Sequence, residues 1–177
     1  MSKSPKQGRL PVALSFRPAD DRLARTAERS PDFDLETVTL ARLINFVSKG
    51  LANAANGGLK AHGLNHAAYA VLVMLYGSAD FTLTPSQLVD ATHEKSANIT
   101  RICDELLKVG LIARSFDAND RRRVQVALTQ AGRVVITRVL PDMVQVTQGS
   151  FIHLSAKERA QLNHLLRKVI DGQEQLA

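Results

Sequence analysis

Residues 84–133 read TPSQLVDATHEKSANITRICDELLKVGLIARSFDANDRRRVQVALTQAGR and predict two short helices followed by a pair of strands. Thr84, Pro85 and Gln87 mark a helix start, because threonine can cap a helix, proline fits its first turn and glutamine can complete a capping box. The first helix is therefore expected to run to about Ala91.

The second helix is expected from Lys95 to Val109, after a connection formed by residues 92–94. Gly110 should end it, since glycine readily adopts the backbone conformation that follows many helices. The apolar residues of this helix recur on one stripe, which would hold it against a core: Ile99, Ile102, Cys103 and Leu106.

After this helix the apolar period changes to that of paired strands. Residues 111–116 and 124–128 are predicted strands, separated by the polar segment DANDRRR at 117–123. The second strand alternates, with its larger apolar residues on one side: Val124, Val126 and Leu128. Two helices, a tight connection and a hairpin with a basic tip predict a winged helix-turn-helix, a mainly α fold with a small β-hairpin wing.

The other side of the second helix carries short polar and cationic side chains near its N-terminal end. A helix that enters the DNA major groove needs such a front. Asn98 can pair bidentately with adenine, and Arg101 can pair with guanine or a phosphate. Ser96 and Thr100 can reach phosphate oxygens or a thymine methyl group. With Lys95, these residues form the candidate DNA-binding set of this helix.

The predicted wing tip concentrates three cations, Arg121, Arg122 and Arg123, which suit the minor groove or its flanking phosphates. Asp120 is expected to pair with Arg121 or Arg122 and stiffen the turn, a structural role for that arginine. Residues 95–133 hold eight Lys or Arg against four acids, a net of +4 within a chain of net charge +6. This concentration favours a polyanionic partner.

Further helices are predicted on both sides of this segment. They are residues 35–59, where apolar residues recur at steps of three and four; 66–76, apolar on nearly every side and capped by Asn65; 130–146, with Pro141 expected to bend it; and a last helix that begins with a capping box at Ser155 and Glu158.

Residues 1–33 carry four prolines and a net charge of +3, and predict a flexible basic arm with one helical turn around residues 20–30. Two interpretations remain open for this arm. It can be a solvated tail, or it can touch DNA phosphates or a partner subunit.

Composition limits the class of protein. A chain of 177 residues with 45% hydrophobic residues can form one ordinary domain with a real core, or one domain plus a second small element. A single cysteine excludes a disulfide framework, and no apolar run approaches the roughly 20 residues of a membrane-spanning helix, so we expect a cytoplasmic protein. The chain has no nucleophile elbow, phosphate loop or metal-spaced pair of histidine and carboxylate, and we expect neither an enzyme nor a cofactor.

Residues 98–133 resemble the recognition-helix, wing and following-helix signature of MarR-family regulators. The matching positions are Thr100, Arg101, Leu106, Gly110, Leu111, Asp120, Arg121, Leu128, Thr129 and Gly132. The flanking helices extend the resemblance to about residues 35–176. The sequence departs from the family pattern at Lys95 and Ser96, where such proteins commonly have a small capping residue followed by a basic one.

The resemblance implies a homodimer with interlocked N- and C-terminal helices and a pseudo-palindromic DNA site with half-sites about one turn apart. The expected division is a flexible basic arm at 1–33, a dimerisation helix at 34–62, a DNA-binding domain at 63–129 and C-terminal dimerisation helices at 130–177. The implied function is a ligand-responsive repressor. An activator of the same fold, or a winged-helix module for protein contacts, is the alternative.

The resemblance also implies a pocket for a small effector, often a hydroxylated aromatic acid, between the DNA-binding lobe and the dimerisation helices. The candidate residues are Asn45, His62, His66 and Tyr69, although core packing also suits Tyr69. His62 and His66 are not expected to share a helical face as metal ligands would. Some relatives sense peroxide through cysteine, but the apolar stripe around Cys103 predicts an inert thiol.

Overall fold

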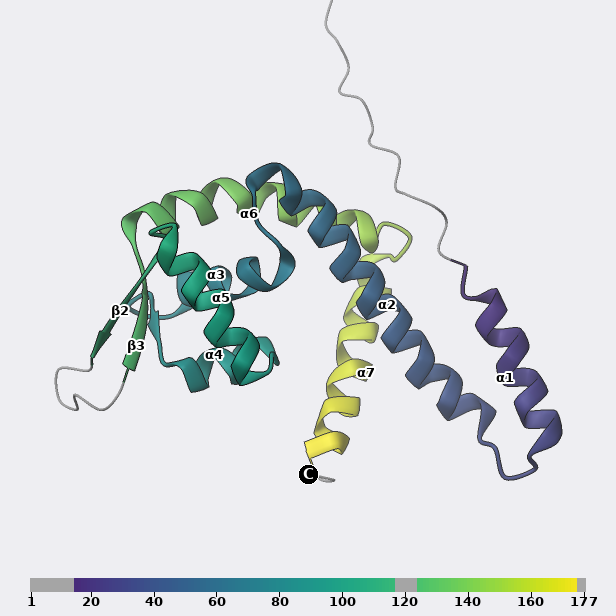
Figure 1. The fold of residues 1–177 in the computed structure, drawn as a ribbon. Helices are drawn as coiled ribbons and strands as arrows, with labels where there is room; N and C mark the ends of the chain where they lie inside the picture. Colours follow the sequence, from purple (N-terminus) through teal and green to yellow (C-terminus); the bar gives the residue numbers. More distant parts are fainter. Residues whose placement is uncertain (1–14, 117–123, 175–177) are drawn as a thin grey trace, which may run out of the picture. The chain divides into compact units, whose positions relative to one another are not determined.

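The computed structural model describes residues 15–116 and 124–174, which form a mostly helical fold with one small antiparallel sheet (Figure 1). Its elements are α1 (Arg17–Arg29), α2 (Leu35–Leu59), the short 3-10 helix η1 (Lys60–His62), α3 (His66–Gly77), β1 (Thr82–Leu83), α4 (Pro85–Thr92), α5 (Ser96–Lys108), β2 (Ile112–Phe116), β3 (Val124–Leu128), α6 (Gln130–Ser150) and α7 (Ala156–Glu174). The chain divides into two compact units, residues 1–52 and 53–177.

The first unit contains α1 and most of α2. The rings of Phe16 and Phe46 meet edge to face, with their centroids 5.3 Å apart. The expectation of a single helical turn in the N-terminal arm was wrong, because residues 17–29 form a helix of 13 residues. Pro18 lies in its first turn, where a missing N–H costs nothing, and Leu23 and Ala27 repeat at helical spacing on a half-buried side.

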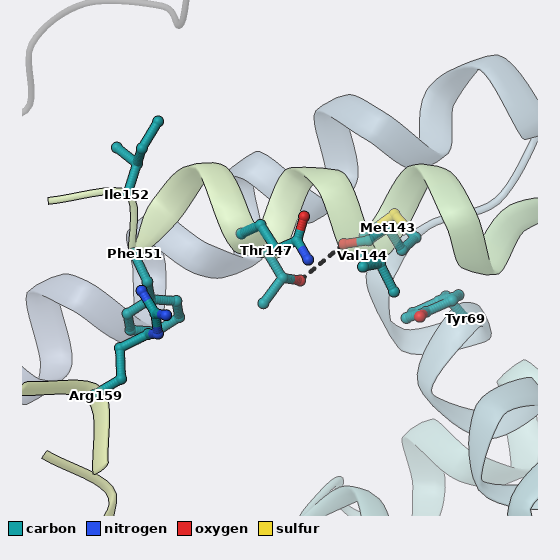
Figure 2. Close-up of a pocket in the computed structure, with 8 residues that line it drawn as sticks. Tyr69, Met143, Val144, Thr147, Phe151, Ile152 and Arg159 are labelled. Carbon is teal, nitrogen blue, oxygen red and sulfur yellow. Dashed lines mark hydrogen bonds between the residues drawn. The ribbon is translucent and has the colours of Figure 1, made fainter. Parts of the chain in front are cut away.

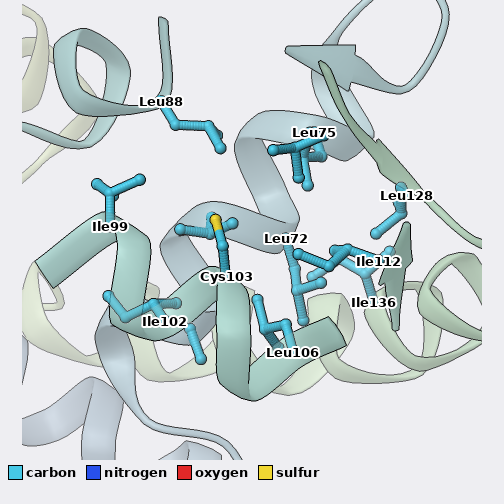
Figure 3. Close-up of a cluster of buried hydrophobic side chains, with 13 residues drawn as sticks. Leu72, Leu75, Leu88, Ile99, Ile102, Cys103, Leu106, Ile112, Leu128 and Ile136 are labelled. Carbon is cyan, nitrogen blue, oxygen red and sulfur yellow. The ribbon is translucent and has the colours of Figure 1, made fainter. Parts of the chain in front are cut away.

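The core of the second unit is built around α3, which is apolar on nearly every side, as predicted. Asn65 caps this helix, since its side chain accepts a hydrogen bond of 2.8 Å from the Ala68 N–H, which confirms the expected cap. Val71, Leu72 and Leu75 on α3 are fully buried, and Figure 3 shows Leu72 and Leu75 among side chains from α4, α5, the strands and α6.

The helix α4 begins at the predicted capping box. The Gln87 N–H donates to the Thr84 hydroxyl oxygen at 3.2 Å, and the Thr84 N–H donates to the Gln87 side-chain oxygen at 2.8 Å. His93 ends the helix in the left-handed conformation, with φ of 54°. The turn that follows places α5 against α4 and α3.

The two predicted strands pair in antiparallel register, with Ile112 opposite Leu128 and Phe116 opposite Val124. The sheet also contains a third strand, which the sequence pattern does not predict. Thr82 and Leu83 in β1 pair with the other edge of β3, so the sheet order is β1-β3-β2. A strand of two residues is too short to show a period, which is why the pattern of the sequence did not reveal it.

A close approach of backbone atoms joins α6 to the end of α5. Thr129 caps α6 by accepting from the Gly132 N–H at 3.0 Å, and its hydroxyl lies 2.8 Å from the Gly110 carbonyl oxygen. A Cβ atom on Gly132 would lie 2.1 Å from the Leu111 carbonyl oxygen. The position therefore requires glycine, and this contact fixes the hairpin base relative to α5.

The last two helices follow the predicted pattern, although α6 is longer than the expected range of 130–146 and continues to Ser150, through Pro141. Ser155 and Glu158 form the predicted capping box of α7, with bonds of 2.7 and 3.3 Å. None of the described side chains of α7 is buried, although the helix carries a row of large apolar residues: Leu165, Leu166, Val169 and Ile170.

Candidate functional site

The helix α5 is held by its apolar side. The four residues of the predicted stripe, Ile99, Ile102, Cys103 and Leu106, are each 3% exposed or less (Figure 3). Lys95 occupies the N-cap position, and within the described part of the chain no side chain supplies a capping hydrogen bond there. The difference from the MarR-family pattern expected at Lys95 therefore lies at the N-cap itself, where a cation stands in place of a capping side chain.

The opposite side of α5 is polar and faces solvent. Lys95, Ser96, Thr100 and Arg101 are exposed, and Asn98 is half-buried. The Thr100 hydroxyl donates to the Ser96 carbonyl oxygen at 3.1 Å, so this side chain is already held against the helix. The five residues predicted from the sequence thus share the side that points away from the core.

Two carboxylates, Glu94 and Glu105, join this polar side and are absent from the set of residues predicted from the sequence. The Asn98 amide nitrogen donates to Glu94 Oε2 at 2.6 Å, and the Asn98 amide oxygen accepts from Arg101 Nη2 at 2.8 Å. Arg101 Nη1 donates to Glu105 Oε1 at 2.6 Å. The contact between Arg101 and Glu105 has a signal in the sequence, because opposite charges four residues apart on a helix can pair.

A further ion pair connects α5 to the hairpin. Arg114 Nη2 on β2 lies 2.8 Å from Asp104 Oδ1 on α5. Both side chains are more than a third exposed, so the pair contributes mainly orientation rather than stability. The predicted wing residues Asp120, Arg121, Arg122 and Arg123 lie outside the described residues.

Cys103 is buried, as its place on the apolar stripe predicted. Burial raises the pKa of its thiol; Arg114 opposes this rise and Asp104 adds to it. Because the thiolate is the reactive form, the environment of Cys103 disfavours oxidation.

A partly open cavity of ≈ 630 Å³ lies between α3, α6 and the start of α7 (Figure 2). Its lining is mostly apolar and comprises Tyr69, Met143, Val144, Thr147, Gln148, Phe151, Ile152 and Arg159. The Tyr69 hydroxyl, whose pKa is raised by burial above its ordinary value of 10.0, is protonated at neutral pH and can donate a hydrogen bond. Arg159, which also lines the cavity (Figure 2), brings a cation to the lining.

Of the four candidate effector residues, Tyr69 lines this cavity. His62 instead points to α6, with its Nε2 atom 2.8 Å from Asp142 Oδ2. His66 is exposed at the start of α3, and the Asn45 amide nitrogen, in the first unit, donates to the Ala41 carbonyl oxygen at 3.1 Å. Across residues 15–116 and 124–174, no three histidine, cysteine or acidic side chains gather as metal ligands would.

The two helices α4 and α5, joined by a tight turn and followed by a small antiparallel sheet, define a winged helix-turn-helix. In this class the second helix enters the major groove and the hairpin contacts the neighbouring backbone. The polar outer side of α5 and its apolar inner side fit that arrangement.

Comparisons with known proteins identify the family. The model of the MarR family matches residues 62–123. The transcriptional repressor MprA of Escherichia coli K12 is 33% identical over 162 residues, which cover 92% of each protein. A mutant of Escherichia coli MarR complexed with operator DNA has a TM-score of 0.70 at 29% identity, covering 78% of this chain and 98% of that chain.

A third relative has a structure that concerns regulation by a small molecule. The BpsR structure from Bordetella bronchiseptica, described with 6-hydroxynicotinic acid as a regulator of its DNA binding, has a TM-score of 0.68 at 27% identity. It covers 74% of this chain and 98% of that chain.

The chain belongs to the MarR family of transcriptional regulators. As a member of that family it is a transcriptional regulator and not an enzyme. No helix within the described ranges is long and apolar enough to span a lipid bilayer.

Proposed function

We propose that this protein is a dimeric repressor that binds a pseudo-palindromic DNA site through α5 of each subunit and acts in the cytoplasm. The observation that carries this proposal is the two-sided character of α5. Its apolar side is locked into the core, whereas Lys95, Ser96 and Thr100 are free of the core on the other side. Such a helix can enter a DNA groove while its apolar side stays packed in the core.

The dimer is proposed from two separate sets of exposed apolar side chains, one on α2 and one on α7. Exposed large side chains on α2 include Leu40, Ile44 and Val47, which are 55%, 43% and 49% exposed. Side chains of this size gain free energy when another chain covers them. A two-fold dimer would present two copies of α5, which is why we expect two half-sites.

The wing is proposed to add phosphate or minor-groove contacts through Arg121, Arg122 and Arg123, with Asp120 holding the turn. Arg122→Ala should weaken binding to all DNA sequences and reduce the slope of log K against log salt concentration by roughly one unit. An unchanged slope would show that this side chain neutralises no phosphate.

Selection of bound duplexes from a random DNA library tests the proposal directly. The purified full chain should enrich a pseudo-palindrome and shift it on a gel at low salt, together with the DNA upstream of its own gene. Failure to shift any duplex at low salt would favour a protein-interaction module instead. Reporter expression with and without the regulator would then distinguish repression from activation.

We further propose that a small aromatic acid binds the cavity and releases the DNA. An apolar cleft with few polar groups suits an aromatic ring, and Arg159 and the Tyr69 hydroxyl can hold a carboxylate or hydroxyl group. The described regulation of BpsR by 6-hydroxynicotinic acid supports this class of ligand. An effector changes DNA affinity only if it binds the two dimer arrangements with different affinity.

Titration calorimetry with 6-hydroxynicotinate and salicylate as probes tests the cavity. Arg159→Ala should weaken binding of an acid probe at least tenfold, by removing the cation from the lining. Arg167→Ala is the matched control, because this arginine also lies on α7 but bonds to Asn163 and does not line the cavity. Equal effects of the two substitutions would contradict the assignment.

A further inference from the structure

The outer side of α5 carries a continuous chain of hydrogen bonds that runs Glu94, Asn98, Arg101, Glu105. Asn98, Arg101 and Glu105 are spaced by three and four residues, so they follow one row along α5, and Glu94 lies in the turn just before the helix. Every link is 2.6 to 2.8 Å long. The row crosses the surface proposed to face the DNA bases.

The links in this chain fix the orientation of the Asn98 amide. Its nitrogen is turned to Glu94 and its oxygen to Arg101. An asparagine that reads adenine bidentately must present both of these atoms to the base. Each of these atoms already makes one strong, charge-assisted bond within the protein. The amide keeps a second N–H and a second oxygen lone pair, but the two bonds set its orientation toward any base.

Arg101 keeps more unused donors than Asn98. A guanidinium has five N–H groups, and one bond leaves from each of its two terminal nitrogens. Each terminal nitrogen therefore keeps a second N–H that can be offered to guanine O6 and N7. The side chain is 56% exposed, so these N–H groups are accessible.

We propose that Arg101 reads one guanine in each half-site, and that Asn98 and Glu105 position its guanidinium instead of contacting the DNA. The two flanking residues hold the planar group from both ends, and Glu94 sets the orientation of Asn98. A long side chain that is already held in its bound geometry loses less conformational freedom when it binds. This inference rests on the proposed DNA-binding function.

The test uses the duplex selected with the wild-type chain and the set of its single-base variants. Arg101→Ala should erase the preference for guanine at one position of each half-site, a loss of about 5- to 150-fold in discrimination. Asn98→Ala and Glu105→Ala should each reduce the preference at that same position several-fold. Combined with Arg101→Ala, neither should have any additional effect there.

Conservative variants separate positioning from charge. Glu105→Gln keeps an acceptor for Arg101 and should retain most of the preference, whereas Asp90→Asn removes a carboxylate that pairs with no cation among the described residues and should change nothing. Thermal unfolding of each variant shows that the domain is intact, since all the substituted side chains are outside the core.

Two results would overturn the inference. Loss of an adenine preference at a neighbouring position in Asn98→Ala would show that the amide reads a base directly. A gain in affinity for all sequences in Glu105→Ala, without any change in base preference, would show that Glu105 merely repels phosphates. If the wild-type chain selects no duplex at all, the proposed function fails instead, and that outcome is seen before any variant is made.

Discussion

The helices α5 and α7 have the same kind of amphipathic sequence but very different surroundings. The four residues of the apolar stripe on α5 are at most 3% exposed, whereas Leu165, Leu166, Val169 and Ile170 on α7 are 39% to 53% exposed. The helix that carries the candidate DNA-reading residues finds its apolar partners within its own chain. The apolar side of α7 needs a partner from outside the described fold, which is why we assign it to a second subunit.

The largest effect is expected where α5 meets the core. Ile102→Ala removes a fully buried side chain and should lower the free energy of unfolding by about 2–5 kcal/mol, because it leaves a cavity that the surrounding helices fill only partly. Urea denaturation measures the change. Ile170→Ala, the same truncation on α7, is the control. In protein dilute enough to be monomeric, it should leave the free energy of unfolding almost unchanged.

The proposed dimer gives the next largest effect. Ile170→Asp puts a charge on the apolar side of α7 and should raise the dimer dissociation constant about 10- to 100-fold, from the loss of apolar burial and the cost of covering a carboxylate. Sedimentation velocity measures the association. Retention of the wild-type dissociation constant would show that α7 lies outside the interface.

The N-termini of the two helices also differ. The start of α7 is capped by Ser155 and Glu158, whereas the start of α5 has no side-chain cap. Lys95→Ser would supply α5 with a capping side chain and should raise the free energy of unfolding by about 0.5–1 kcal/mol. It should also weaken DNA binding and lower the salt slope by roughly one unit, since a cation is lost. A gain in stability with unchanged DNA binding would show that Lys95 does not contact the DNA.

Features of this fold that depend on neighbours in the sequence could be predicted. The caps at Thr84, Asn65 and Ser155 and the stripe on α5 need only residues three or four positions apart, and the structure confirms each of them. The outer row of α5 was predicted only in part. Its polar residues were recognised, but the bonds from Glu94 and Glu105 depend on side-chain conformations that a pattern of residues does not specify.

Features that depend on distant segments could not be predicted. The strand β1 exists because Thr82 meets Ala127 across the sheet, and the pair Asp104–Arg114 exists because β2 runs back beside α5. The cavity likewise brings Tyr69 together with Arg159, 90 positions further along the chain. A local pattern of residues does not encode contacts between distant segments. For this reason the sequence could not predict that Asn45, His62 and His66 lie outside the cavity lining.

The smallest expected effect concerns the cap of α7. Hydrogen bonds from Ser155, first from its side chain and then from its backbone, lower the pKa of Glu158 below its ordinary value of 4.5. A carboxylate with a lowered pKa in the folded state stabilises the fold above its unfolded pKa, and this contribution is lost as the pH falls through the folded pKa.

Glu158→Gln keeps the acceptor of the capping box but does not titrate, so it isolates this effect from the cap itself. The urea midpoints of wild type and variant should differ slightly at pH 7 and converge as the pH falls below 4.5, at one protein concentration so that the dimer equilibrium is matched. Midpoints that stay apart at low pH would mean that the carboxylate charge is not what stabilises the start of α7.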